Sequence, residues 1–202
     1  MKWRQVLCEH ATDLAGALRE VRAEESRTFL ARYAEVTGPM RSDVDLPTKR
    51  DFAVEEIGGA MANLILYQVT AEGEPTLRVV GQNVRARFSV NPIGMSHLQF
   101  THADRRENVL RSFREQVTRP CGVILDLQQI SATGRGMDCE VVGLPLRGDG
   151  EERFVMVMDT VVGSPMWTDP SDRLRYTHAR HRTFIDLGAG WPRDFVDLVP
   201  DE

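Results

Sequence analysis

The sequence lacks the features that mark secreted, membrane-spanning and nucleic-acid-binding proteins. It has only 3 cysteines, Cys8, Cys121 and Cys139, with no CxxC spacing, so the thiols are expected to be reduced. No apolar run is long enough to span a bilayer, and the first residues form no apolar signal segment. The formal net charge of −5 provides no basic surface for nucleic acid. We therefore expect a cytoplasmic protein that binds neither membrane nor nucleic acid.

Motifs of common catalytic and cofactor sites are also missing. There is no GxSxG, HExxH, GxGxxG or GxxxxGK[ST] pattern. Residues 131–136 are glycine-rich, but they join two expected strands and are interpreted as a hairpin loop. His178 and His181 lack the third ligand of a metal site, and His97 and His102 match no haem motif. The sequence thus indicates no catalytic residue, no metal and no cofactor.

What is present first is a helical pattern in the opening forty residues. Apolar residues recur at alternating spacings of four and three, which marks one stripe of a helix. These residues are Leu7, Ala11, Leu14, Leu18 and Val21. Gly38 and Pro39 would end this helix. We predict that the stripe forms the seam of a homodimer; the alternative is a helix that caps its own domain.

Further along, the periodicity changes to that of strands around a helical stretch. The apolar phase changes near Val141, for which we predict a β-bulge, since side chains alternate with a period of two. Residues 154–158 are apolar throughout, which predicts a central strand covered on both faces. This order predicts an α+β fold with an antiparallel five-stranded sheet. The expected elements are strands at 64–69, 77–80, 121–128, 137–146 and 154–158, with helices near 83–88 and at 103–118.

Five short segments then carry a family resemblance. They are LPTKRDF at 46–52, LRVVG at 77–81, NPIG at 91–94, LPL at 144–146 and FIDLG at 184–188. With the order of two strands, helices and three strands, they resemble the PAS domains of a family common in alphaproteobacteria. The resemblance implies a PAS-like sheet with a helical excursion. It also implies a bacterial module that senses a ligand, dimerises and signals through a separate protein partner.

On this basis the chain divides into three parts: an N-terminal helical extension at 1–38, a PAS-like domain at 39–163 and a C-terminal extension at 164–202. In a PAS arrangement, a set of apolar side chains would lie between the helices and the sheet. Methionine and phenylalanine suit a deformable ligand pocket. The predicted pocket residues are Phe88, Met95, Leu98, Phe100, Phe113, Leu125, Met156 and Met158. The alternative is that these side chains fill a solid core.

We therefore predict a non-catalytic PAS-type sensory module that binds a small ligand, a protein partner or both, and that forms homodimers. Two other functions stay open. One is a small α+β enzyme with a hotdog-like or cone-like pocket, which would need a pair of polar groups converging in that pocket. The other is a ligand-free structural adaptor with a solid core.

Overall fold

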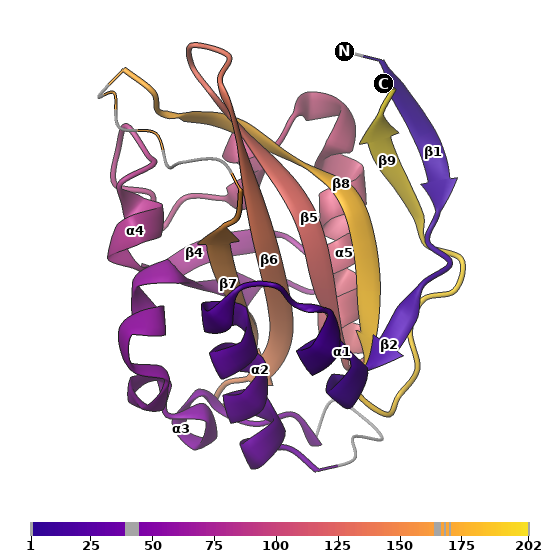
Figure 1. Ribbon diagram of the computed structural model, residues 1–202. Helices are drawn as coiled ribbons and strands as arrows, with labels where there is room; N and C mark the ends of the chain where they lie inside the picture. Colours follow the sequence, from indigo (N-terminus) through magenta and orange to yellow (C-terminus); the bar gives the residue numbers. More distant parts are fainter. Residues whose placement is uncertain (1, 39–44, 164–166, 168, 170, 202) are drawn as a thin grey trace.

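A twisted antiparallel sheet organises the protein, whose computed structural model describes residues 2–38, 45–163, 167, 169 and 171–201 (Figure 1). Its seven strands lie in the order β2-β8-β5-β6-β7-β3-β4, and neighbours are antiparallel except β2, which is parallel to β8. A separate antiparallel ribbon pairs β1 with β9. The strands are β1 (Trp3–Leu7), β2 (Ala11–Asp13), β3 (Leu64–Val69), β4 (Pro75–Val80), β5 (Cys121–Ser131), β6 (Gly136–Arg147), β7 (Arg153–Val161), β8 (Leu174–Asp186) and β9 (Val196–Pro200).

The predicted five-stranded antiparallel core is confirmed. The strands β5, β6, β7, β3 and β4 are adjacent in the sheet, and β7 and β3 are both interior. Both segments that we predicted as extensions also contribute strands to this sheet, namely β2 from the N-terminal segment and β8 from the C-terminal one. In the described part of the chain, no helix is both long and apolar enough to cross a membrane.

The predicted bulge near Val141 is wrong. Strand β6 keeps one register through this region against β5 and against β7. Val141 packs in one core layer and Val142 in the other, as alternation requires. Because helices cover both faces, each face can be apolar over a different part of the strand, and the sequence then resembles a change of phase.

The predicted N-terminal helix is also wrong. Residues 3–20 form β1, β2 and the short helix α1 (Leu14–Glu20), and a second helix α2 (Glu24–Val36) follows. The Asp13 carboxylate starts α1 by accepting a hydrogen bond of 2.6 Å from Gly16 N. Val21 ends α1 in an extended conformation. The two helices are therefore separate.

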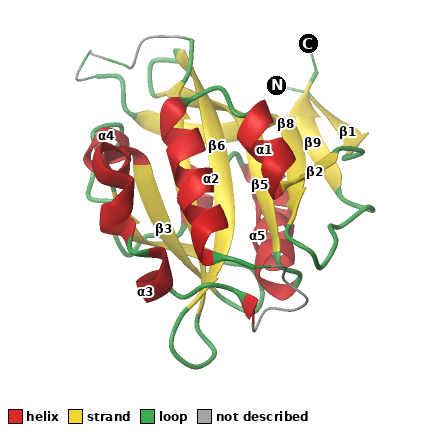
Figure 2. Ribbon diagram, turned by 60° about the horizontal axis from the view of Figure 1, so that its bottom comes forward, coloured by secondary structure: helices red, strands yellow, loops and turns green. Residues whose placement is uncertain are grey.

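The residues of the predicted dimer seam consequently do not share a helix. Leu7 is exposed in β1 and Ala11 lies in β2. Leu14 and Leu18 of α1 pack against the same core layer that contains buried Val21. Thus α1 and α2 cover a face of their own sheet, which was the alternative interpretation (Figure 2).

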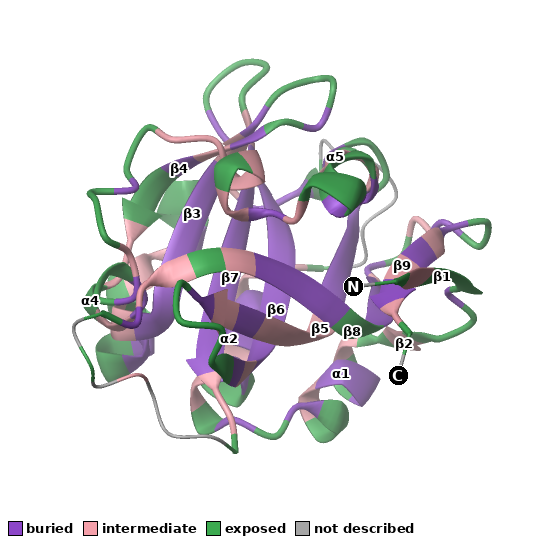
Figure 3. Ribbon diagram, turned by 90° about the horizontal axis from the view of Figure 1, so that it is seen from above, coloured by how far each residue is buried: buried purple, intermediate pink, exposed green. Residues whose placement is uncertain are grey.

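Helices cover the sheet on both faces. On the first face lie α1, α2, α3 (Lys49–Phe52) and the 3-10 segment η2 (Val54–Asn63). Buried Glu140 of β6 fixes α2 there, because its carboxylate accepts from Arg22 N at 2.7 Å and Ala23 N at 3.1 Å. On the second face lie α4 (Gln82–Arg85), η3 (His97–Phe100), η4 (Ala103–Arg105) and α5 (Arg106–Thr118). The view from above shows α5 and α2 on opposite sides of the strands (Figure 3).

Candidate functional site

A cavity of about 80 Å³ lies between α5 and the second face of the sheet. Its apolar wall comes from alternate residues of the strands, which point to this face because side chains alternate along a strand. The lining residues are Ile65 and Tyr67 of β3, His97 of η3, Arg105 of η4, Val109, Ser112, Phe113 and Gln116 of α5, Val123, Leu125, Leu127 and Gln129 of β5, Val141 and Gly143 of β6, Val155, Val157 and Asp159 of β7, and Thr177, His178, Ala179 and Arg182 of β8.

Gly143 lets the side chains of Gln116 and Val123 approach the backbone of β6 closely at one end of the cavity. A Cβ atom at this position would lie 3.0 Å from Gln116 Oε1 and 3.1 Å from Val123 Cγ2. Any larger residue would therefore crowd the Gln116 and Val123 side chains. The glycine here is explained by this close approach, since no turn or positive φ requires it.

Two of the predicted pocket residues, Phe113 and Leu125, line the cavity. Phe88 and Phe100 pack against the same core layer and contact each other, with ring centroids 4.7 Å apart, but they do not line the cavity. Met95 is half-buried outside it.

Half-buried Leu98 of η3 is likewise absent from the cavity wall. The prediction placed Met156 and Met158 on the wrong face. Both are buried against the N-terminal helices, while their neighbours Val155 and Val157 line the cavity. Strand alternation separates the two pairs, and the sequence of a strand that is apolar throughout does not show which of its faces meets which helices.

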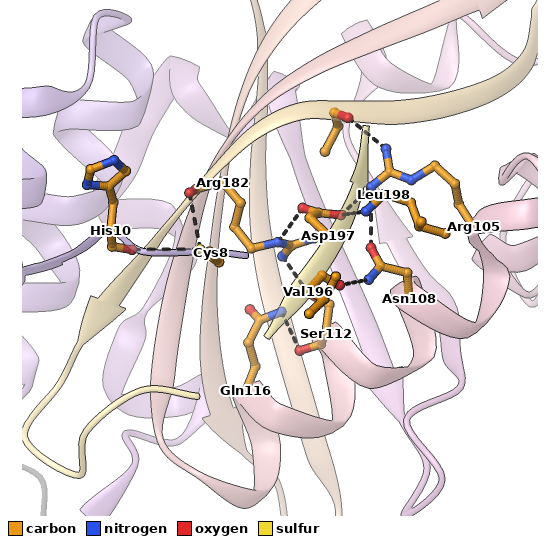
Figure 4. Close-up of polar contacts among 11 residues, drawn as sticks. Cys8, His10, Arg105, Asn108, Ser112, Gln116, Arg182, Val196, Asp197 and Leu198 are labelled. Carbon is orange, nitrogen blue, oxygen red and sulfur yellow. Dashed lines mark hydrogen bonds and ion pairs between the residues drawn. The ribbon is translucent and has the colours of Figure 1, made fainter. Parts of the chain in front are cut away.

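A cluster of buried charged residues lies where β9 packs against the wall of the cavity (Figure 4). Asp197 of β9 accepts from Arg105 Nη2 at 2.7 Å and from Arg182 Nε at 2.9 Å. Arg105 also donates to the carbonyl of Ala179 at 2.7 Å, and Arg182 donates to Ser112 Oγ at 2.7 Å. These bonds join η4, α5, β8 and β9 at one point.

This cluster carries more positive than negative charge. Arg105, Arg182 and Asp197 are 2%, 6% and 4% exposed. Both arginines line the cavity, whereas Asp197 does not. Burial lowers the pKa of Arg105 to about 10, against the opposing effect of Asp197, and the neighbouring Arg182 charge lowers it further. An uncompensated buried charge is costly, so this end of the cavity favours an anion.

The other end of the cavity is electrically balanced. Buried Arg87 donates to Asp159 Oδ1 at 2.7 Å, and Gln129 Nε2 donates to Asp159 Oδ2 at 2.8 Å. Tyr67 Oη lies 3.1 Å from His97 Nδ1. Burial lowers the pKa of His97 to about 4, so this ring is neutral at pH 7.

Four buried side-chain atoms of the lining residues have no hydrogen-bond partner among the described residues. They are Arg105 Nε, Gln116 Oε1, Gln129 Oε1 and His178 Nδ1. Burial lowers the pKa of His178 to about 4, and the charges of Arg105, Arg180 and His102 add to this effect. Native proteins pair nearly all buried polar groups, so these four atoms are exceptions, although each has less than 1 Å² of accessible surface.

Sequence reasoning missed the charged cluster. Neither Arg105 nor Arg182 was singled out from the sequence, although both are buried. One signal was available: Arg182 is two residues from the apolar Phe184 in a strand, so both share a face. The pairing of Arg105 with Asp197 joins residues 92 positions apart, and no local pattern predicts it.

The structure adds no metal centre or reactive thiol. Among the described residues, no three His, Cys, Asp or Glu side chains are grouped as a metal site would require. Cys8, Cys121 and Cys139 are buried and free. Burial raises the pKa of Cys121 to about 12, which makes it a poor nucleophile at neutral pH.

Comparison with known proteins identifies one family. A family model described as a PAS domain matches residues 22–158, more than half of the chain. Among solved structures, the chain is similar to one titled "Crystal structure of PAS domain of HTR-like protein from Haloarcula marismortui", with 20% sequence identity and a TM-score of 0.39. The similarity covers 56% of this chain and 98% of that one. No curated protein matches the chain.

Proposed function

The chain belongs to the PAS domain family, whose members are typically non-catalytic sensory and signalling modules, and we propose that this one senses a small polar molecule bound between α5 and the sheet. One observation carries the proposal: two buried arginines, Arg105 and Arg182, line the cavity and share the single carboxylate of Asp197. A solid structural core would not leave an excess of buried positive charge beside a cavity, because an uncompensated buried charge is costly.

The signal has a physical route out of the cavity. Asp197 binds both cavity-lining arginines and belongs to β9, which pairs with β1. The described ends of the chain lie close together in this ribbon (Figure 1). An occupant that contacts either arginine would change the strength of the Asp197 contacts. We propose that the β1–β9 ribbon then packs differently against the domain, and that a separate protein partner recognises this change.

Homodimerisation remains part of the prediction. The helical seam on which it was based does not exist in the structure, so its test is the mass of the protein in solution, measured by sedimentation at tens of micromolar.

The proposed function is tested by native mass spectrometry of the purified protein and by hydrogen exchange. We expect a small molecule to be retained or taken up, and amide exchange in β1 and β9 to change when it binds. Gly143→Ala should reduce uptake because the added methyl group, 3.0 Å from Gln116 Oε1 and 3.1 Å from Val123 Cγ2, displaces side chains that line the cavity. Gly59→Ala is the matched control, since a Cβ there meets nothing within 4 Å.

The structural-adaptor alternative predicts the opposite result. If the cavity is only a packing defect, no small molecule is found by mass spectrometry. That outcome would end the sensory proposal.

A further inference from the structure

A groove on the surface lies beside the cavity, and one residue belongs to the walls of both. The groove has a volume of about 270 Å³ and is lined by residues 6–10, residues 180–182 of β8, and Asp197 and Val199 of β9. Val6 and Leu7 of this lining are 37% and 48% exposed, so the groove is open to solvent. Among the described residues, Arg182 is the only one that lines both the groove and the cavity. Arg182 therefore separates the interior space from solvent.

The Arg182 side chain has a charged partner on the groove side and a hydroxyl partner on the cavity side. Its Nε donates to Asp197 Oδ2 at 2.9 Å, and Asp197 lines the groove but not the cavity. Its Nη1 donates to Ser112 Oγ at 2.7 Å, and Ser112 lines the cavity. The close-up shows the Arg182 side chain extending from Cys8 toward Ser112 (Figure 4). The Arg182–Asp197 ion pair is thus part of the wall between the two spaces.

This wall differs from the other walls of the cavity. The strands β5, β6 and β7 keep continuous registers behind it, so hydrogen-bonded backbone closes that side. The buried pair of Arg87 and Asp159 lies at the opposite end. At Arg182, by contrast, the partner Asp197 belongs to a ribbon that forms no strand pairs with the main sheet. A shift of this ribbon would open the wall and leave the strand pairs of the main sheet intact.

Resting on the proposed function for the presence of a ligand, we propose that the groove is the entrance to the cavity and that the Arg182–Asp197 ion pair is its gate. The gate opens when β9 moves and Asp197 separates from Arg182, and it closes when the two side chains pair again. The cavity of about 80 Å³ behind it admits only a small molecule.

A thiol in the cavity wall measures entry without knowledge of the ligand. Val141 lines the cavity, and Val141→Cys is a change of small volume. Methyl methanethiosulfonate, a small neutral reagent, converts an accessible thiol to a methyl disulfide. Peptide mass mapping distinguishes position 141 from the three native cysteines, which are buried. We expect position 141 to be modified in the folded protein at a rate that does not depend on dilute urea, because a local opening exposes little new surface.

A bulky side chain in the groove should slow this modification. Leu7 lines the groove and is 48% exposed, so Leu7→Trp narrows the entrance and leaves the core unchanged. We expect the rate to fall at least about tenfold, which corresponds to about 1.4 kcal/mol in the barrier to entry. Ile93→Trp is the matched control. Ile93 is 44% exposed and lies beside residues that hydrogen-bond to β4, at the sheet edge opposite β8, so this variant should keep the original rate.

Two further variants test the side chain at position 182 itself. Both carry Arg105→Met and Asp197→Leu, so that no unpaired buried charge destabilises the fold. One adds Arg182→Met, which keeps a long side chain in the wall, and the other adds Arg182→Ala, which shortens it. We expect modification at position 141 to be at least about tenfold faster in the alanine variant. The difference should be independent of dilute urea, which separates an open gate from general unfolding.

The inference is overturned if Leu7→Trp and Ile93→Trp give the same rate, because the entrance then lies elsewhere. It is also overturned if position 141 is not modified, or is modified only with the steep urea dependence of global unfolding. Equal rates in the two variants at position 182 would show that Arg182 is not the gate. None of these results changes the test of the proposed function, since native mass spectrometry detects a bound molecule by whatever route it enters.

Discussion

Replacing Asp197 by asparagine removes the one negative charge from the buried cluster. In the native protein its carboxylate accepts from Arg105 Nη2 at 2.7 Å, Arg182 Nε at 2.9 Å and Leu198 N at 3.0 Å. All three charged residues are buried. The variant keeps the shape of the side chain but leaves two buried guanidinium groups without a counter-charge.

Breaking a buried ion pair in this way costs about 3–5 kcal/mol. Because a domain is stabilised by only about 5–15 kcal/mol in total, a large shift of the urea midpoint is expected. Asp194→Asn is the control. Asp194 also pairs with an arginine, Arg111, at 2.8 Å, but its side chain is 85% exposed. An exposed pair contributes at most about 1 kcal/mol.

The combined variant Arg105→Met, Arg182→Met, Asp197→Leu supplies the second arm of this experiment. Replacing a whole buried charged cluster by apolar residues is often neutral or stabilising, because no desolvated charge remains. We therefore expect it to be more stable than Asp197→Asn. The reasoning is refuted if Asp197→Asn loses less than about 1 kcal/mol of unfolding free energy, or if the combined variant is the less stable of the two.

Three further predictions follow from the same contacts. Replacing both Leu14 and Leu18 by lysine should lower the melting temperature without changing the mass in solution, since both pack on their own core; a change of mass at unchanged stability would contradict this. Glu140→Gln should lose about 1–3 kcal/mol in urea unfolding, because a buried carboxylate accepts two backbone N–H groups; an unchanged midpoint would show that the cap is not needed. His178 has a pKa of about 4 in the folded state and about 6.5 unfolded, so its contribution is complete above pH 6.5 and falls by about 1.4 kcal/mol per pH unit down to pH 4. His178→Gln should flatten the pH dependence of stability in that window; a slope equal to that of the unaltered protein would refute the assignment.

The strands of the sheet were predictable because their signal is local. Residues 121–128 alternate between apolar and polar, and 154–158 are apolar throughout, and both patterns depend only on the pleat of a strand. The N-terminal segment failed for the same reason. A spacing of four and three is a local pattern, and over Leu7 to Val21 it spans two strands and a short helix. The cap by Asp13 was the available sign that a helix starts at Leu14 rather than earlier.

The pocket was found only in its apolar part, and the physics of burial explains why. Phe113 and Leu125 were identified because an apolar residue in a regular pattern is assigned to the interior. The same rule assigns arginine to the surface, and it therefore removed Arg105 and Arg182 from consideration. A buried charge is tolerated only where a partner of opposite charge reaches it, and that partner, Asp197, comes from a strand that lies outside the main sheet. When the other residues on one face of a strand are apolar, a charged residue on that face is an exception, because it is buried with them and needs a partner of opposite charge. Arg182, on the same face as Phe184, is such an exception, and it indicates the charge at this end of the cavity more directly than any apolar residue of its wall.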